Sequence, residues 1–296
     1  MQHRTAYLLL MLTTLAWGGN AIAGKLAVGH ISPMLLTGAR WIVALAILVA
    51  IGWPRVVADW PKIKPKLPLL VALGALGFTA FNVCLYGALV YTSAINASIE
   101  QAAIPMVIFL LNFLFFRIRV TWMQIAGFIV SVAGVLLVAT HGEPARLLQL
   151  DVNVGDALVL VALLFYAIYS VCLRFKPDIH WQSMMIVMGA AAFVTSLPFV
   201  AAEAALGATV LPDATGWTII LFVAVFPSIV SQVLFMKGVE LIGANRAGLF
   251  INLVPVFGTL LSIALLGEAF FAYHAMALAL ALGGIALAEA SGRKQV

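Results

Sequence analysis

Long apolar runs constrain this chain more than any other feature of its sequence. A helix of about 20 apolar residues is long enough to cross the hydrocarbon core of a bilayer, which is about 30 Å thick. The period-two alternation of a membrane β-barrel strand is absent. Ten runs, most of them near this length, cover approximately residues 5–28, 33–52, 68–90, 93–115, 121–139, 154–174, 182–202, 215–236, 243–265 and 271–289.

The composition supports the same class of fold. Of 296 residues, 64% are hydrophobic and 9% are charged, whereas soluble domains carry roughly 25% charged residues. We therefore expect an all-α integral membrane protein embedded in a lipid bilayer. The first run lacks a clear small-residue cleavage site, so we interpret it as a retained span and not as a signal peptide. Cys84 and Cys172 fall inside apolar runs and are interpreted as buried small residues.

The positions of the basic residues predict how the chain is oriented. Short cytoplasmic loops of membrane proteins carry an excess of Lys and Arg. With both termini in the cytoplasm, ten spans place 13 of the 16 basic residues on the cytoplasmic side, and only Arg146 lies in an outer link. The net charge of +5 thus needs no nucleic acid to explain it. The 13 are Arg4, Arg55, Lys62, Lys64, Lys66, Arg117, Arg119, Arg174, Lys176, Lys237, Arg246, Arg293 and Lys294.

An internal repeat predicts the domain organisation. Residues 94–111 resemble residues 244–261, and five matched positions, each 150 apart, pair Ala94, Ala97, Pro105, Leu110 and Leu111 with Ala244, Ala247, Pro255, Leu260 and Leu261. The link at residues 140–153 divides the chain into two five-helix repeats, residues 1–139 and 154–296. Because five is odd, the second repeat enters the membrane from the opposite side. We therefore expect ten transmembrane helices arranged as two inverted five-helix repeats.

Three charged residues inside the runs are candidates for charge recognition or coupling. Such residues are costly in lipid and usually face the protein interior or a water-filled pathway. Glu100 and Arg40 each follow the start of an outward-starting run by seven residues, roughly 10 Å of helix. Arg40 could meet a substrate carboxylate, and Glu100 an ammonium group or a proton; a structural ion pair or a cap on backbone carbonyls is the alternative. Lys25 could also simply reach the membrane surface.

Polar and aromatic residues near the middle of several runs are candidates for lining a substrate pathway. Residues three or four apart on a helix share a face, and this spacing groups such residues in the third and sixth runs. Aromatic rings and amides would suit an amphiphilic ligand, although packing between helices explains each of them equally well. The candidates, with Glu100, are Trp17, Asn20, Phe78, Asn82, Tyr86, Gln101, Tyr166, Tyr169, Ser170, Gln232 and Asn252.

The positions of two prolines and of six tryptophans predict structural roles. Pro105 and Pro255 lie deep in the fourth and ninth runs, where each removes a backbone hydrogen bond. They are therefore candidate hinges, with a fixed kink as the alternative. Tryptophans near the ends of membrane helices usually anchor the interface, and we interpret six in this way: Trp41, Trp53, Trp60, Trp122, Trp181 and Trp217.

Several of these segments resemble the drug/metabolite transporter superfamily in its ten-helix EamA branch. The segment Trp17-Gly18-Gly19-Asn20 followed by Lys25 is similar to the first helix of that branch, and so are the spacing from Pro33 to Arg40, the two proline segments and Gly283-Gly284. The chain looks closest to YddG-type exporters of aromatic and other amino acids. This resemblance implies that the ten helices surround a central cavity. It also implies a bacterial inner-membrane exporter that works by alternating access, without a cofactor. Where the fourth helix of the family often closes with Gly-Glu, this chain has Phe116-Arg117, so Glu268 of the second half is expected to stabilise a helix end.

Other functions remain open at this point. A carrier of sugar phosphates or nucleotide sugars would need several converging cations, and only Lys25 and Arg40 are placed for that. An intramembrane enzyme lacks support because the spans contain no HExxH, Asp pair or Ser/His arrangement. No metal-ligand cluster is evident, and the absence of a sizeable loop argues against a receptor or scaffold. The substrate, the coupling ion and the oligomeric state, a monomer included, are not determined by the sequence.

Overall fold

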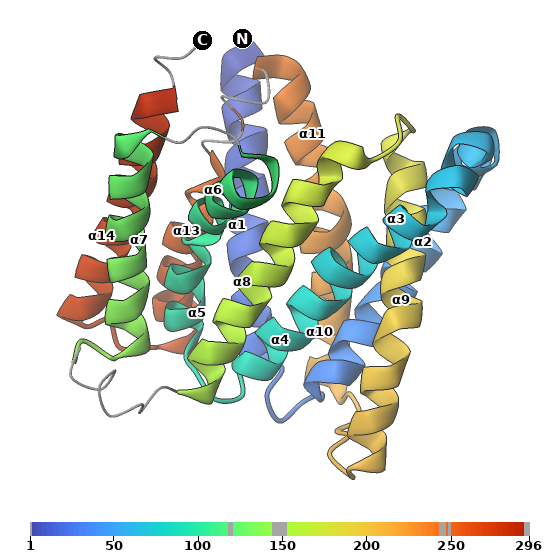
Figure 1. The fold of residues 1–296 in the computed structure, drawn as a ribbon. Coiled ribbons are helices and arrows are strands. Elements are labelled where there is room, and N and C mark those ends of the chain that lie inside the picture. The colour runs from blue at the N-terminus through green and yellow to red at the C-terminus, as the bar shows by residue number, and fades with distance from the viewer. Residues whose placement is uncertain (1, 118–120, 144–152, 243–246, 248–249, 293–296) are drawn as a thin grey trace.

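The computed structural model describes residues 2–117, 121–143, 153–242, 247 and 250–292. The predictions made for Arg119, Arg146, Ala244, Arg246, Arg293 and Lys294 therefore lie outside the described residues. The described chain is helical, with the α-helices α1 (Gln2–Leu26), α2 (Pro33–Ile63), α3 (Leu67–Gly74), α4 (Phe81–Ala88), α5 (Ala94–Gln101), α6 (Ile104–Phe116), α7 (Trp122–Ala139), α8 (Val154–Cys172), α9 (Trp181–Ala205), α10 (Ala214–Val225), α11 (Ser231–Ile242), α13 (Val254–Leu261) and α14 (Ala272–Gly292) (Figure 1).

Six helical stretches among the described residues are long and apolar enough to cross a membrane: His3–Leu26, Pro33–Ala88, Ala94–Phe116, Val154–Phe175, Trp181–Ala205 and Ala214–Ile242. Three shorter apolar helices accompany them. The all-α membrane architecture expected from the apolar runs is thus confirmed at this level. Cys84 and Cys172 are free thiols but only half-buried, so they are less buried than expected.

The second helix is longer than the sequence indicated. We expected a link at residues 53–67, but α2 continues to Ile63 and includes Pro54 and Pro61. Contacts with α9 hold this extension, because the Asp59 carboxylate accepts hydrogen bonds from the His180 backbone N–H at 2.8 Å and the Ser183 hydroxyl at 2.7 Å. The two prolines therefore do not end the helix at residue 52, because contacts with α9 stabilise the extension.

Four irregular segments occur in pairs about half a chain apart. The helix breaks at Ala102–Ala103, between α5 and α6, and again at Asn252–Leu253, just before α13. Each break directly precedes a proline-bearing turn that contains Pro105 or Pro255. Two π-helical turns, η2 (Ala75–Ala80) and η5 (Phe226–Val230), similarly interrupt the helices on either side of them. Such turns often mark functional sites, and all four segments border the cavity described below.

Close helix packing surrounds these irregular segments. In Figure 1, α1 runs through the middle of the molecule, and its neighbours include α11 and α13. A Cβ atom on Gly18 would lie 2.8 Å from the Gly258 backbone nitrogen, and one on Gly258 would lie 2.4 Å from the Ser98 hydroxyl oxygen. Glycine at both positions therefore lets α1, α5 and α13 approach backbone to backbone. The pairs α7 with α14 and α2 with α9 flank this centre.

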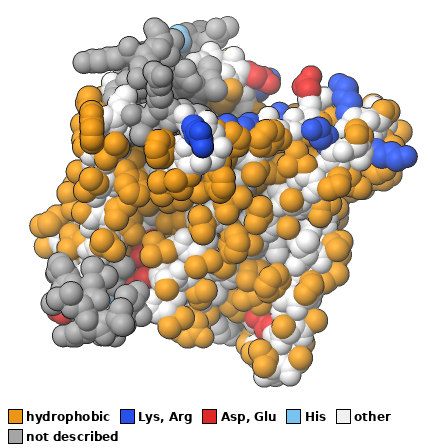
Figure 2. Space-filling model, in the orientation of Figure 1, with side chains coloured by type: hydrophobic (Ala, Val, Ile, Leu, Met, Phe, Trp, Pro, Cys, Tyr) orange, Lys and Arg blue, Asp and Glu red, His pale blue; other side chains and the backbone are white. Residues whose placement is uncertain are grey.

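The two ends of the helix bundle differ in charge. The start of α1 and the end of α14 lie at one end, which we call the terminal end, and the opposite end is the far end (Figure 1). Lys and Arg side chains gather at the terminal end in Figure 2. At the far end, carboxylates stabilise helix starts. Glu268 accepts hydrogen bonds from the backbone N–H groups of Ala94 and Ile95, both at 2.9 Å, which gives it the structural role expected at a helix end.

Candidate functional site

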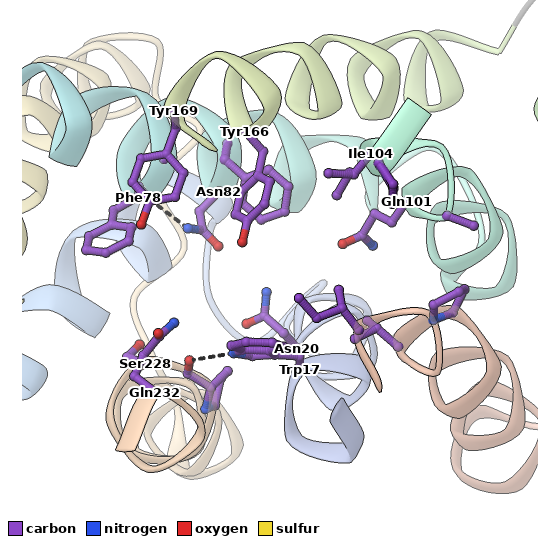
Figure 3. Close-up of a pocket in the computed structure, with 18 of the residues that line it drawn as sticks. Trp17, Asn20, Phe78, Asn82, Gln101, Ile104, Tyr166, Tyr169, Ser228 and Gln232 are labelled. Carbon is purple, nitrogen blue, oxygen red and sulfur yellow. Dashed lines mark hydrogen bonds between the residues drawn. The ribbon is translucent and has the colours of Figure 1, made fainter. Parts of the chain in front are cut away.

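A cavity of about 150 Å³ lies in the middle of the helix bundle, where the interrupted helices meet. Figure 3 shows Trp17 and Asn20 of α1 facing Tyr166, Tyr169 and Asn82 across it, with Gln101 and Ile104 on a third side and Ser228 and Gln232 on a fourth. Both helix breaks contribute to its wall through Ala102, Pro105, Asn252 and Pro255. Its small volume, below the roughly 300–1,000 Å³ of typical ligand pockets, suits a small molecule.

Arg40 supplies the charge of this cavity. Its side chain is 5% exposed and lies against the wall of the cavity. Its Nε donates to the Ser228 hydroxyl at 2.6 Å, and its Nη1 donates to the Asn82 side-chain oxygen at 2.9 Å and to the Tyr86 hydroxyl at 2.7 Å. These partners are all neutral, and no described carboxylate lies within ion-pair distance of the guanidinium. The site therefore holds a positive charge that the described residues do not neutralise.

The partners of Arg40 are themselves fixed by further hydrogen bonds. The Tyr86 hydroxyl donates to the Asn20 side-chain oxygen at 2.8 Å, and the Asn82 side-chain nitrogen donates to the Phe78 carbonyl at 2.7 Å. The Ser228 hydroxyl donates to the Val223 carbonyl at 2.7 Å, inside the π-helical region. Because each acceptor is held in place, the guanidinium is oriented before any ligand arrives. Among the described residues its Nη2 has no hydrogen-bond acceptor, which leaves donors available.

Six aromatic residues contribute to the wall of the cavity. Trp41 stacks on Phe78 with ring centres 4.7 Å apart and planes 12° apart. Tyr166 lies against Phe81 and Tyr169, with ring centres 5.2 and 5.4 Å away. A Cβ atom on Gly77 would lie 2.5 Å from the Tyr169 ring, so glycine in η2 makes room for that ring. The wall of the cavity therefore combines one cationic side chain, several amide side chains and a group of aromatic rings.

Most of the predicted pathway residues lie on the wall of this cavity. They are Trp17, Asn20, Phe78, Asn82, Gln101, Tyr166, Tyr169, Gln232 and Asn252, and Arg40, Pro105 and Pro255 accompany them. The sequence placed these residues near mid-membrane on separate helices, and the fold brings them together. Their roles in binding remain predictions.

Four predicted residues lie outside the cavity wall. The Lys25 ammonium donates to the carbonyls of Leu89 and Thr92 at 2.9 and 2.7 Å, so it caps a helix end. The Ser170 hydroxyl donates to the Tyr166 carbonyl of its own helix at 2.8 Å. Tyr86 is 1% exposed, and its hydroxyl accepts a hydrogen bond from Arg40. Glu100 is fully buried and does not border the cavity.

Several residues of the cavity wall were assigned another role from the sequence or were not predicted. Trp41 was expected at the membrane interface, but it is 1% exposed and lines the cavity. Phe81 and Ser228 also line it and were not predicted. Phe81 lies three residues after Phe78, so the aromatic spacing on the third run could have identified it. Ser228 follows Pro227 within a π-helical turn, and no sequence pattern that we used signals such a turn.

Comparison with known proteins identifies relatives along the whole chain. The EamA-like transporter family matches it twice, over residues 4–140 and 153–289. The uncharacterized transporter YetK of Bacillus subtilis is 25% identical over 287 residues, covering 95% of this chain and 85% of that protein. A probable terminal-alkyne amino-acid exporter of Streptantibioticus cattleyicolor is 31% identical over 137 residues, 46% of each chain. One protein crystal structure, 20% identical, has a TM-score of 0.64 and covers 99% of each chain, so the two share a fold.

Proposed function

This chain belongs to the EamA-like transporter family, and from that premise we propose that it exports small amphiphilic carboxylates, aromatic amino acids first among them, across the bacterial inner membrane. The observation that carries the proposal is Arg40, a buried cation without an acidic partner among the described residues, in an aromatic cavity. A guanidinium binds a carboxylate through two parallel hydrogen bonds. The rings of the wall would hold an apolar side chain.

The polar end of an amino acid also carries an ammonium group, and the cavity offers neutral acceptors for it. The side chains of Gln101 and Gln232 lie on the wall and carry amide oxygens. The Asn20 side-chain oxygen, by contrast, already accepts from Tyr86 and Arg40. No described acidic residue lies there, so the ammonium would be bound by dipoles alone. One relative, the probable terminal-alkyne amino-acid exporter, supports export as the direction of transport.

Organic anions without an ammonium group are the second candidate class. They are favoured by the same observation, since the cavity wall contains a cation and no described acid. Sugar phosphates and nucleotide sugars fit less well, because phosphate groups want several cations and Lys25 is occupied by the carbonyls of Leu89 and Thr92. A single carboxylate matches a single guanidinium.

Transport into liposomes tests the proposal directly. We expect purified protein to mediate saturable uptake of radiolabelled tryptophan or phenylalanine, with unlabelled amino acids as competitors. Empty liposomes and liposomes with the Arg40→Met variant are the controls. Uptake of an aromatic carboxylate that lacks an ammonium group, without uptake of any amino acid, would replace the first class of substrate by the second. Uptake of neither class would contradict the proposed function.

We further propose that the two copies of the family unit cross the membrane in opposite directions, with five spans each, and that movement between them alternates access to the cavity. Several observations support this arrangement. The helix breaks beside Pro105 and Pro255 occupy corresponding places in the two halves. The π-helical turns η2 and η5 do so as well. Both pairs border the cavity, where changes in helix direction would open one side or the other.

The arrangement predicts which loops face the cytoplasm. Basic residues gather at the terminal end (Figure 2), and this supports the proposal that this end faces the cytoplasm. In a variant without Cys84 and Cys172, we expect a cysteine at Lys64 to react with an impermeant thiol reagent only after permeabilisation, and one at Leu206 to react in intact cells. Leu206 is 82% exposed, whereas Ser32, at the same end, is buried against Glu203. A cysteine at Lys176, in the second copy, should match Lys64. Equal labelling of Lys64 and Leu206 in intact cells would contradict the orientation.

A further inference from the structure

A second polar cluster lies between the cavity and the far end, and it contains two buried acids. Glu100 of α5 and Asp156 of α8 are both 0% exposed, and α5 packs against α8. Among the described residues, neither oxygen of Glu100 has a hydrogen-bond partner, and neither does Oδ2 of Asp156. The other oxygen of Asp156 accepts a short hydrogen bond from the Thr92 hydroxyl. The cluster therefore contains three carboxyl oxygens without a described hydrogen-bond donor.

A path of polar groups connects this acid pair to the far end. His141 is partly exposed there, and its Nε2 lies 4.0 Å from Asp156 Oδ2. The Asn96 amide donates to the Thr92 hydroxyl at 3.4 Å, and Asn96 lies one helical turn before Glu100. The His274 ring closes the cluster, with its Nε2 3.2 Å from the Asn96 side-chain oxygen. Polar groups thus extend from the partly exposed imidazole of His141 to the buried carboxyl group of Asp156.

The remaining charged groups around α5 are already engaged elsewhere. Lys25, on α1, donates to the Leu89 and Thr92 carbonyls. Glu268, after the π-helical turn η6 (Ser262–Leu266), accepts from the Ala94 and Ile95 N–H groups. The aromatic hydroxyls of α8 face the cavity, and the described part of α13, which also packs against α5, contains no titratable residue. No described Lys or Arg therefore compensates a negative charge on Glu100.

The physical cost of that charge determines what the cluster can bind. An ionised carboxylate that is removed from water without a partner costs several kcal/mol, and a buried acid takes up a proton instead. A metal ion would need at least three converging ligands, and among the described residues no group of three His, Cys, Asp or Glu is arranged for that. A proton is the cation that a buried carboxyl group binds without any further ligand.

We propose that Glu100 and Asp156 form a proton-binding site, reached from the far end through His141, which couples proton movement to substrate movement in the opposite direction. The proposal rests on the proposed transport function. Protonation breaks one O–H bond of a hydronium ion in the water beside His141 and forms one O–H bond on Glu100. Release breaks that bond on Glu100 and forms a hydronium ion again. No other bond forms or breaks.

The position of Glu100 explains how the proton would act on the cavity. Gln101, the next residue, lines the cavity wall, and the helix breaks immediately afterwards at Ala102–Ala103. Loss of the proton would leave an unpaired charge in an apolar place, so the deprotonated state favours an arrangement in which water reaches Glu100. The hinge beside Pro105 is the element that such a movement would use. Protonation would thereby bias which side of the cavity is open.

Two transport measurements on one preparation separate coupling from substrate binding. In liposomes without a pH gradient, exchange of labelled for unlabelled tryptophan reports the binding site. Accumulation of labelled tryptophan under an imposed pH gradient reports coupling. We expect Glu100→Gln to exchange at a rate within about twofold of the wild type and to lose gradient-driven accumulation at least tenfold. Asp156→Asn should show the same separation. Glu100→Asp keeps a carboxyl group and should retain part of the accumulation.

The control is Glu240→Gln, because Glu240 is exposed and pairs only with Lys237 among the described residues. It should behave as the wild type in both assays. Gradient-driven accumulation by Glu100→Gln at the wild-type level would overturn the proposal. A wild-type protein that exchanges but does not respond to the gradient would also overturn it, while leaving the proposed function in place.

Infrared spectroscopy tests the proton site without reference to transport. At neutral pH the wild type should show the carbonyl stretch of a protonated carboxylic acid, and this band should weaken or vanish in Glu100→Gln but not in Glu240→Gln. Persistence of the band in Glu100→Gln and in Asp156→Asn, or its absence from the wild type, would overturn the proposal whatever the substrate is.

Discussion

Replacing Arg40 by methionine should lower transport of carboxylate substrates by roughly 30-fold or more in kcat/KM. The guanidinium is the charged group of the cavity wall, and removing one partner of a buried, hydrogen-bonded charge pair costs about 2–5 kcal/mol, where each 1.4 kcal/mol is a factor of ten. Methionine keeps much of the side-chain volume. The measurement is initial uptake of labelled tryptophan at several concentrations, normalised to the amount of folded protein in the liposomes.

Arg40→Lys should lie between methionine and the wild type. Lysine keeps the charge but has no planar fork, so it cannot reach Ser228, Asn82 and Tyr86 together and still present donors to a substrate. The control is Lys237→Met, which removes a 63% exposed cation from another helix and should leave uptake unchanged. Wild-type uptake by a folded Arg40→Met protein would show that Arg40 does not bind the substrate.

Stability must be measured beside transport, because Arg40 also organises the cavity wall. Methionine would leave the Asn82 and Tyr86 side chains without their donor, and an unsatisfied buried polar group costs about 1–3 kcal/mol. A matched variant separates the two effects. Ser228→Ala removes the partner of Nε but keeps the guanidinium, so it should share the loss of thermal stability and retain most of the transport. A parallel fall in both variants would indicate a structural role for Arg40.

The sequence predicted the features that depend on local chemistry. Apolar runs gave the helices, because only a hydrogen-bonded helix satisfies the backbone of a single segment inside a membrane. Pro105 and Pro255 marked two places where helices break, because proline cannot donate the required hydrogen bond. Amides and aromatic rings near mid-span marked most of the cavity wall. Each of these signals lies within a few residues of the feature that it predicts.

Features that depend on packing between helices were not predictable in this way. Trp41 was interpreted as an interface anchor because it lies near the start of a run, but its burial depends on Phe78, on another helix. The extension of α2 past Pro54 depends on His180 and Ser183, more than 120 positions later. Asp156 was not singled out in the sequence, whereas in the structure it is buried beside Thr92 and His141. The burial of a polar residue depends on the residues that lie near it in space, and a single sequence does not identify those residues.

Removing the carboxylate from a substrate should weaken binding far more than removing its ammonium group. Tryptophan can be compared with tryptamine, which lacks the carboxylate, and with indole-3-propionate, which lacks the ammonium group, as competitors of labelled tryptophan uptake. Tryptamine would leave Arg40 unpaired in a buried site, at a cost of about 2–5 kcal/mol, and should compete roughly 30-fold or more less well. Indole-3-propionate loses only the interaction of the ammonium group with neutral amides and should compete roughly tenfold less well, which corresponds to the net loss of one hydrogen bond of about 1.5 kcal/mol.

The order of the two analogues follows from the charges on the cavity wall. Arg40 is a cation there, and no described carboxylate faces it across the cavity. A site built chiefly to bind ammonium would place an acid on the wall, as Glu100 would have done had it faced the cavity. Because Glu100 is buried away from the wall, we expect the substrate to contribute the negative charge. Competition by tryptamine as strong as that by tryptophan would mean that Arg40 is neutralised by another group, and the carboxylate would then have no role in recognition. Competition by indole-3-propionate equal to or stronger than that by tryptophan would identify organic anions as the preferred substrates.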